Sequence, residues 1–380
     1  MMTEKLFYKD SYISEFEAEV VSYLQVEDGF YLALSKTAFF PESGGQSSDS
    51  GYIDDSIVTY VYEKDEVIYH RVNKLPEGKH VSCKINFAER FDKMQQHTAE
   101  HILCGIIHRL YGYDNVGFHL GDDVVTFDIN HPLTRDQIDL VEELANQAVF
   151  QNIKVETSFP AADKLEKMLY RSKLDFLDNV RIVKIGDVDS CACCAPHVNY
   201  TGEIGLIKCL DFMSHRGGVR ITMCAGSRAL RDYREKYRNI REISAMLCEP
   251  QSTTSDGVKK YMLDREKDRF ELRTIKKAYA ESLASAVSAE KNYVIVLENL
   301  DMDDAREFAN RSVLNVGGIV VALIGKENDY KYIMASRTKD LRSMSKDINQ
   351  KLNGRGGGQP QMIQGSLFTT LEKIKEYFDC

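Results

Sequence analysis

The chain has 380 residues, more than one ordinary domain contains, so two or three domains are expected. Hydrophobic residues make up 43%, enough for packed cores, and the net charge of -9 excludes a uniformly basic nucleic-acid coat but not a local basic face. No stretch approaches the roughly 20 apolar residues of a membrane-spanning helix, and the polar N-terminus is unlike a signal peptide, so we expect a soluble cytoplasmic protein.

Residues 1–88 alternate short β-rich runs with turns, which predicts a small antiparallel sheet or barrel. The expected strands are 17–26, 29–34, 58–63, 67–72 and 80–85. Among them lies a long segment, residues 37–49, here named the glycine loop after Gly44 and Gly45. Two adjacent glycines let backbone come close to a ligand or to the next domain. Gln46, which follows them, can meet a substrate or cap a turn.

Residues 89–227 show an α+β pattern that contains candidate metal ligands. A helix is expected from residue 88, then strands at 124–129 and 181–185 with a helix at 135–151. The first helix carries an H-x-x-E-H run at 97–101, and a C-x-x-x-H run lies at 193–197 within a cysteine cluster. Three nitrogens and one sulfur are a donor set that Zn²⁺ takes in tetrahedral sites. By spacing alone, Cys191 or Cys194 can supply the thiolate instead of Cys193. The predicted ligands are His97, His101, Cys193 and His197.

Two further regions complete the chain. Residues 228–290 have apolar residues at helical spacing with a break at Pro250, which predicts a helical hairpin or rod, and their surplus of Lys and Arg indicates a solvated face or phosphate contact. Residues 291–380 are expected to form a C-terminal α/β domain. This domain closes with a glycine-rich turn in which Arg355 and Gly357 are candidate phosphate contacts, with a packing turn as the alternative.

Several motifs resemble one family in order and spacing. Residues 90–101 resemble the first metal motif of the alanyl-tRNA synthetase editing domain, and residues 39–51 resemble its F-Y-x-E-S-G-G-Q-x-x-D-x-G segment. Residues 193–198 resemble its C-G-G-T-H-V motif, with Cys-Ala-Pro where the family has Gly-Gly-Thr. Residues 217–221 resemble its G-V-R-R-I, and residues 356–364 resemble the DHH-associated C-terminal domain of those synthetases. Because 380 residues leave no room for an aminoacylation core, the chain is similar to freestanding alanyl-tRNA editing proteins of the long AlaX type.

This resemblance implies a zinc-dependent deacylase that removes Ser, and in some cases Gly, from mischarged tRNA-Ala. It implies the four metal ligands given above, Thr98 as the group that bonds a seryl hydroxyl, and His119 as a pocket residue. The residues themselves leave other interpretations open: Thr98 as a helical threonine bonded to its own backbone, and His119 as a core histidine. Arg220 is a candidate for contact with the tRNA terminus or for pairing with a carboxylate. The apolar stripes permit a homodimer without requiring one.

Two rival functions remain at this point. The H-x-x-E-H run also fits inverted zincin metalloproteases, in which the glutamate, here Glu100, acts as general base. The other rival is a non-catalytic tRNA-binding protein whose zinc is purely structural.

Overall fold

The computed structural model describes residues 2–172 and 180–380. The chain divides into two compact units, Met1–Ile240 and Arg241–Cys380. Both contain helices and sheets, which confirms the predicted α+β class. The four-part division into residues 1–88, 89–227, 228–290 and 291–380 stays a prediction. Among the described residues, no helix combines the length and the apolar character needed to cross a membrane.

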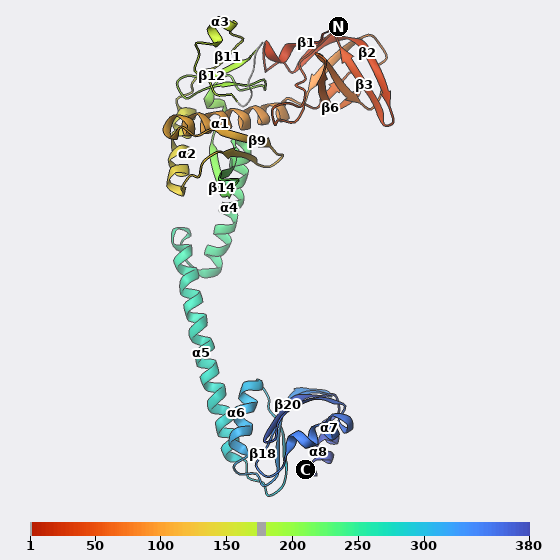
Figure 1. Cartoon of the computed structure of the whole chain (residues 1–380), viewed down its shortest axis with the longest axis vertical. Coiled ribbons are helices and arrows are strands. Elements are labelled where there is room, and N and C mark those ends of the chain that lie inside the picture. Colours follow the sequence, from red (N-terminus) through yellow and green to blue (C-terminus); the bar gives the residue numbers. More distant parts are fainter. Residues whose placement is uncertain (1, 173–179) are drawn as a thin grey trace. The chain divides into compact units, whose positions relative to one another are not determined.

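The first unit begins with a closed six-stranded barrel in the order β2-β3-β7-β6-β5-β8 (Figure 1). Strands β7 and β8 alternate more and less buried positions at every second residue, because successive side chains point to opposite faces. The sequence pattern missed β5, which is too short to show alternation. The barrel strands are β2 (Glu15–Val26), β3 (Gly29–Leu34), β5 (Gly51–Ile53), β6 (Ser56–Lys64), β7 (Val67–Val72) and β8 (His80–Ile85). The short strands β1 (Glu4–Lys5) and β4 (Lys36–Thr37) pair with each other, and η1 (Leu6–Tyr8) is a 3-10 helix.

A long helix, α1 (Phe87–Tyr111), follows the barrel directly. It ends at Gly112, whose φ of 68° permits its N–H to bond the carbonyl oxygen of His108. Residues 96–107 are all buried, because α1 packs against the second helix and against strands of two sheets. The helix is therefore an internal element of the first unit rather than a surface helix with one polar face.

Two sheets and the helix α2 (Arg135–Phe150) pack against α1. One sheet has the order β14-β15-β10-β9 and the other β11-β12-β13. Thr134 begins the second helix with a capping box, since its side chain accepts from the Gln137 N–H and the Gln137 side chain bonds back. The elements are β9 (Asn115–Leu120), β10 (Val125–Ile129), α2 (Arg135–Phe150), β11 (Val155–Ser158), α3 (Ala162–Leu165), β12 (Ile182–Ile185), β13 (Asp189–Ala192), η2 (Thr201–Ile204), β14 (Ile207–His215) and β15 (Gly218–Ala225).

The second unit contains a five-stranded sheet with the order β16-β17-β18-β20-β19. Separate apolar cores lie on its two faces, one with α5 and α6 and the other with α7 and α8. The helix α4 (Gly226–Leu247) spans the division between the units, followed by η3 (Gln251–Thr253). The remaining elements are α5 (Thr254–Ala286), β16 (Tyr293–Val296), α6 (Met302–Ser312), β17 (Ile319–Lys326), β18 (Asp329–Ser336), α7 (Leu341–Lys351), β19 (Gly354–Gln359), β20 (Met362–Leu367) and α8 (Leu371–Tyr377).

Candidate metal centre

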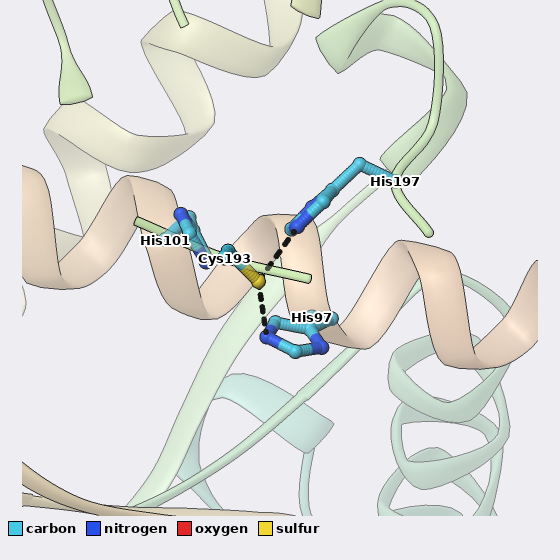
Figure 2. Close-up of side chains that lie close together, drawn as sticks. All are labelled: His97, His101, Cys193 and His197. Atoms are coloured by element: carbon cyan, nitrogen blue, oxygen red, sulfur yellow. Dashed lines mark hydrogen bonds between the residues drawn. The ribbon is translucent and has the colours of Figure 1, made fainter. Parts of the chain in front are cut away.

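Three histidines and one cysteine converge in the interior of the first unit. His97 and His101 lie one turn apart on α1, and Cys193 and His197 lie in the segment that follows β13. The donor atoms of all four lie within 4.8 Å of one another. The Cys193 Sγ lies 3.6 Å from His97 Nε2 and 3.4 Å from His197 Nε2. Dashed lines mark both contacts in Figure 2. The structure thus brings together the four residues that the sequence singled out.

Each histidine of this group uses its Nδ1 atom in a hydrogen bond to an oxygen. The other ring nitrogen, Nε2, is the one that can bind a metal. Histidines that bind metals usually have such a partner, because it sets the tautomer and the direction of the ring. All three partner oxygens belong to buried residues. The pairs are His97 Nδ1 with Gln46 Oε1 at 2.9 Å, His101 Nδ1 with Asp189 Oδ2 at 3.0 Å, and His197 Nδ1 with Thr98 Oγ1 at 3.0 Å.

The electrostatics of the group fit a cation. Burial raises the pKa of the Cys193 thiol, and the neighbouring Cys194 adds to this. Burial, followed by the proximity of His101 and His97, holds the pKa of His197 well below its ordinary value. Neutral imidazoles can each offer a lone pair, and a divalent cation compensates the thiolate that forms when the cysteine loses its proton. This donor set fits Zn²⁺ in particular.

Asp189 and Arg171 were not singled out by the sequence. Arg171 donates from Nε to Asp189 Oδ1 at 2.7 Å and from Nη2 to Oδ2 at 2.9 Å. Burial alone would raise the pKa of the Asp189 carboxyl, but the hydrogen bond from His101 and the Arg171 charge lower it. Because residues 189, 191 and 193 recur at every second position, their period of two was a signal that could have placed Asp189 beside the ligands.

The structure distinguishes the three clustered cysteines. Cys193 groups with the three histidines, whereas Cys191 groups with His101 and Asp189 in a second set of nearby donor atoms. Cys194 belongs to neither set. Asp189 already accepts two guanidinium hydrogen bonds and one from His101. The set of Cys193 with the three histidines therefore has more lone pairs available for a metal than the set that contains Asp189.

Arg181 is a further residue that the sequence did not single out. Its Nη1 donates to the carbonyl oxygens of Cys193 at 3.0 Å and of Ala195 at 2.8 Å. The side chain is buried, and its guanidinium lies over the Tyr8 ring with 5.3 Å between the Arg181 Cζ and the ring centroid. Arg181 therefore holds the turn that carries Cys193.

Thr98 is fully buried, and its hydroxyl donates to the Met94 carbonyl oxygen at 2.7 Å. This is the bond that the helical-threonine interpretation expects. The same oxygen meets His197 Nδ1, so Thr98 also orients a predicted ligand. A contact between Thr98 and a seryl hydroxyl stays a prediction.

His119 and Arg220 lie apart from the four donor residues. His119 is exposed on β9, whereas the preceding Phe118 faces His97 with 4.6 Å between ring centroids. Because neighbours along a strand point to opposite faces, His119 points away from this group, and its exposure rules out the core-histidine interpretation. Arg220 pairs with Asp128 through two bonds, Nε to Oδ1 at 2.7 Å and Nη2 to Oδ2 at 2.8 Å, as its carboxylate alternative expects.

Gly44 and Gly45 both have positive φ, of 60° and 82°. The Gly45 carbonyl oxygen accepts the Leu120 N–H at 3.0 Å, and a Cβ at Gly45 would lie 2.7 Å from the Phe118 carbonyl oxygen. The close approach expected of the glycine loop is thus an approach to β9. Ligand contact by these glycines stays a prediction.

The predicted glycine-rich turn near the C-terminus is wrong, because β19 (Gly354–Gln359) is an extended edge strand paired with β20. Glycine is depleted in strands, which made a turn the expected structure. Here it is required by close packing, since a Cβ at Gly356 would lie 2.3 Å from the Tyr332 hydroxyl oxygen. Arg355 and Gly357 lie on this strand, and their contact with phosphate stays a prediction.

Glu100 does not join the four donor residues, although it completes the H-x-x-E-H run. Its Oε1 accepts from the Asn115 side-chain amide and from the Cys104 thiol, the latter at 3.3 Å. All three residues are buried. A glutamate held in this way is not placed to act as the general base of an inverted zincin.

Comparisons with known proteins show what this chain is similar to. The family model of the threonyl and alanyl tRNA synthetase second additional domain matches residues 180–222, the segment with Cys193 and His197. This segment is therefore similar to that domain of those synthetases. Over its whole length it is similar to the alanyl-tRNA editing protein AlaX-L of Pyrococcus horikoshii, with 27% identity covering 98% of this chain and 96% of that protein. The resemblance inferred from the motifs is thus confirmed.

Longer relatives match as well. The alanine–tRNA ligases of Pyrococcus furiosus and Pyrococcus abyssi are 30% and 28% identical over 98% of this chain, which spans 43% of each ligase. Among solved structures, the C-Ala domain of the Aquifex aeolicus alanyl-tRNA synthetase aligns with 23% of this chain and 87% of that domain, at 16% identity. Its TM-score of 0.21 is too low to define a fold.

Proposed function

We propose that this protein is a trans-acting hydrolase that deacylates mischarged tRNA-Ala, carrying Ser and in some cases Gly, at a zinc centre. The observation that carries the proposal is the group of three buried histidines and one half-buried cysteine, in a chain similar along its length to an alanyl-tRNA editing protein. An alanine-sized pocket rejects glycine or an added hydroxyl by only ~1–3 kcal/mol, so a separate hydrolytic site supplies the missing discrimination.

In this proposal the chain holds the metal and orients its ligands. The four donor residues would hold Zn²⁺, which would supply Lewis acidity at the ester carbonyl through an opened or fifth coordination position, or orient the substrate amine. Gln46, Asp189 and Thr98 keep the protons of the three histidines on Nδ1, so that each Nε2 lone pair is available. Phe118 lies against the His97 ring and reduces the access of water from that side.

The proposed division of labour follows the four predicted parts. Residues 1–88 and 89–227 form the barrel and the editing domain, and residues 228–290 link them to a C-terminal domain that binds tRNA or mediates self-association. Arg355 and Gly357 are the proposed phosphate contacts in that last domain. Because phosphate contacts release counterions, the hydrolysis rate is expected to fall as the salt concentration rises.

The test is incubation of the full-length protein with Ser-, Gly- and Ala-charged tRNA-Ala, with and without a chelator. We expect hydrolysis of the seryl ester and protection of the alanyl ester, loss of activity with the chelator, and recovery when Zn²⁺ is added back. Salt-independent hydrolysis, or equal hydrolysis of all three esters, would contradict the proposal.

Two variants separate the proposal from its rivals. Cys193→Ala is expected to lower deacylation by about 100-fold or more while circular dichroism still shows a folded protein. Glu100→Gln is expected to retain most activity, whereas a zincin-type protease would lose nearly all turnover. Unfolding of Cys193→Ala, together with no deacylation by the wild-type protein, would favour the non-catalytic rival with a structural zinc.

A further inference from the structure

The glycine loop runs along one face of α1 and is bonded to this helix at three positions. The three helix residues are spaced by three and four, so they share one face. All three are buried. The contacts are Arg90 Nε to Asp49 Oδ1 at 2.9 Å, Lys93 Nζ to the Ser48 carbonyl oxygen at 2.7 Å, and His97 Nδ1 to Gln46 Oε1 at 2.9 Å.

The opposite side of the glycine loop is fastened as well. Gly45 accepts the Leu120 N–H of β9, and the space beside Gly45 is filled by Phe118. The residue that follows Gly45 is therefore held between α1 and β9. Gln46 is 0% exposed, so its side chain has little freedom to leave His97.

The Gln46 amide carries a buried donor that has no partner. Its Oε1 faces His97 Nδ1, while its Nε2 is buried without a hydrogen bond. An unsatisfied buried donor is unfavourable. The reversed amide would satisfy Nε2, but it would require the His97 proton to sit on the ring Nε2, where a metal must bind. The observed orientation is the one that metal binding needs.

We propose that Gln46 is a positioning residue through which the barrel sets the affinity of the metal centre. By accepting the Nδ1–H of His97, it fixes the tautomer and the ring direction of one ligand. Arg90 and Lys93 hold the loop that carries Gln46, through Asp49 and the Ser48 carbonyl oxygen. This inference rests on the metal site of the proposed function. It assigns Gln46 a contact with a ligand rather than with the substrate, and it makes the N-terminal barrel part of the metal centre.

The test measures Zn²⁺ affinity of the full-length protein by competition with a chromophoric chelator, and the visible absorption of its Co²⁺ form. Gln46→Met removes the acceptor and is expected to weaken Zn²⁺ binding by about 10–100-fold and to alter the Co²⁺ spectrum. Gln46→Asn keeps an amide that is too short to reach and should show the same loss. Gln46→Glu keeps the acceptor and should stay within about threefold of the wild type.

Gln96→Met is the matched control, because Gln96 is also 0% exposed on α1 and its amide bonds the Ala225 backbone at 2.9 and 2.7 Å. It should lower thermal stability and leave the metal affinity of the folded protein unchanged. Equal Zn²⁺ affinities of the wild type, Gln46→Met and Gln46→Asn would overturn this inference alone. A loss of Zn²⁺ affinity in Gln46→Glu as large as that in Gln46→Met would do the same. A wild-type protein that binds no Zn²⁺ would instead overturn the metal site itself.

Discussion

The glycine loop of the first unit and the strand β19 of the second contain the same sequence signal and use it differently. In the glycine loop, Gly44 and Gly45 adopt positive φ, and the chain turns so that Gln46 reaches His97. In β19, Gly356 lies in an extended strand, and the Tyr332 hydroxyl occupies the space that a Cβ at this glycine would need. Glycines therefore indicate a close approach between the backbone and another part of the protein. The polar residues around them determine which part that is.

The polar anchors of the glycine loop have no counterpart of the same kind in β19. Asp49 pairs with the buried Arg90 at one end of the loop, and Thr37 bonds His70 Nε2 at the other end, at 2.8 Å. The strand β19 is instead held by its ladder with β20 and by the Asn349 side chain, which donates to Gly356. The following predictions test this difference.

The largest effect is expected from Arg90→Met. This change leaves the Asp49 carboxylate buried and unpaired, which typically destabilises a protein by about 3–5 kcal/mol. Urea unfolding of the full-length protein measures it. The control is Lys5→Met, whose ion pair with Glu63 is partly exposed, at 24% and 32%, and should contribute at most about 1 kcal/mol. A loss for Arg90→Met as small as that of the control would show that Arg90 does not anchor the loop.

The second-largest effect is expected in the pH dependence of stability, and it comes from His70, the partner of Thr37. Burial lowers the pKa of His70 from its ordinary value of 6.5 to about 4. The unfolded chain therefore takes up the proton first, and stability that is fully present above pH 6.5 is lost as the pH falls toward 4, by roughly 3 kcal/mol. His70→Gln does not titrate, so the acid-induced loss in urea unfolding should shrink by about that amount. The same loss in both proteins would exclude His70 as its source.

The third effect separates the two glycine segments directly. Gly45→Ala places a Cβ 2.7 Å from Phe118 at a φ of 82°, which we expect to destabilise the first unit by about 2 kcal/mol. It should also weaken Zn²⁺ binding, because it displaces Gln46. Thermal unfolding together with the chelator competition measures both. Unchanged stability would mean that the loop does not press on β9.

The smallest effect is expected from Gly357→Ala in β19. No atom lies within 4 Å of a Cβ at this position, so the free energy of unfolding should change by less than about 0.5 kcal/mol. The same unfolding measurement applies. A loss as large as that of Gly45→Ala would indicate that β19 also requires glycine at this half-buried position.

Some features could be predicted from the sequence because they depend on local patterns. Alternation located the longer barrel strands, and the spacing of His97 and His101 placed both on one face of a helix. The partners of those histidines depend on tertiary contacts. Gln46 lies 51 positions from His97 and Asp189 lies 88 positions from His101, so no local pattern joins either pair. The period of two from Asp189 to Cys193 relates Asp189 only to the cysteine ligand. β19 was missed because its glycines are needed for packing that only the folded sheet reveals.

The burial of α1 has a consequence for how the first unit opens. The barrel is fastened to this helix by Arg90 and Lys93, and two sheets pack against the same helix. A local fluctuation that frees one of these parts must break contacts along α1. The amide hydrogens in the middle of α1 should therefore exchange with solvent only when the whole first unit unfolds. The barrel and the two sheets should lose protection at the same denaturant concentration.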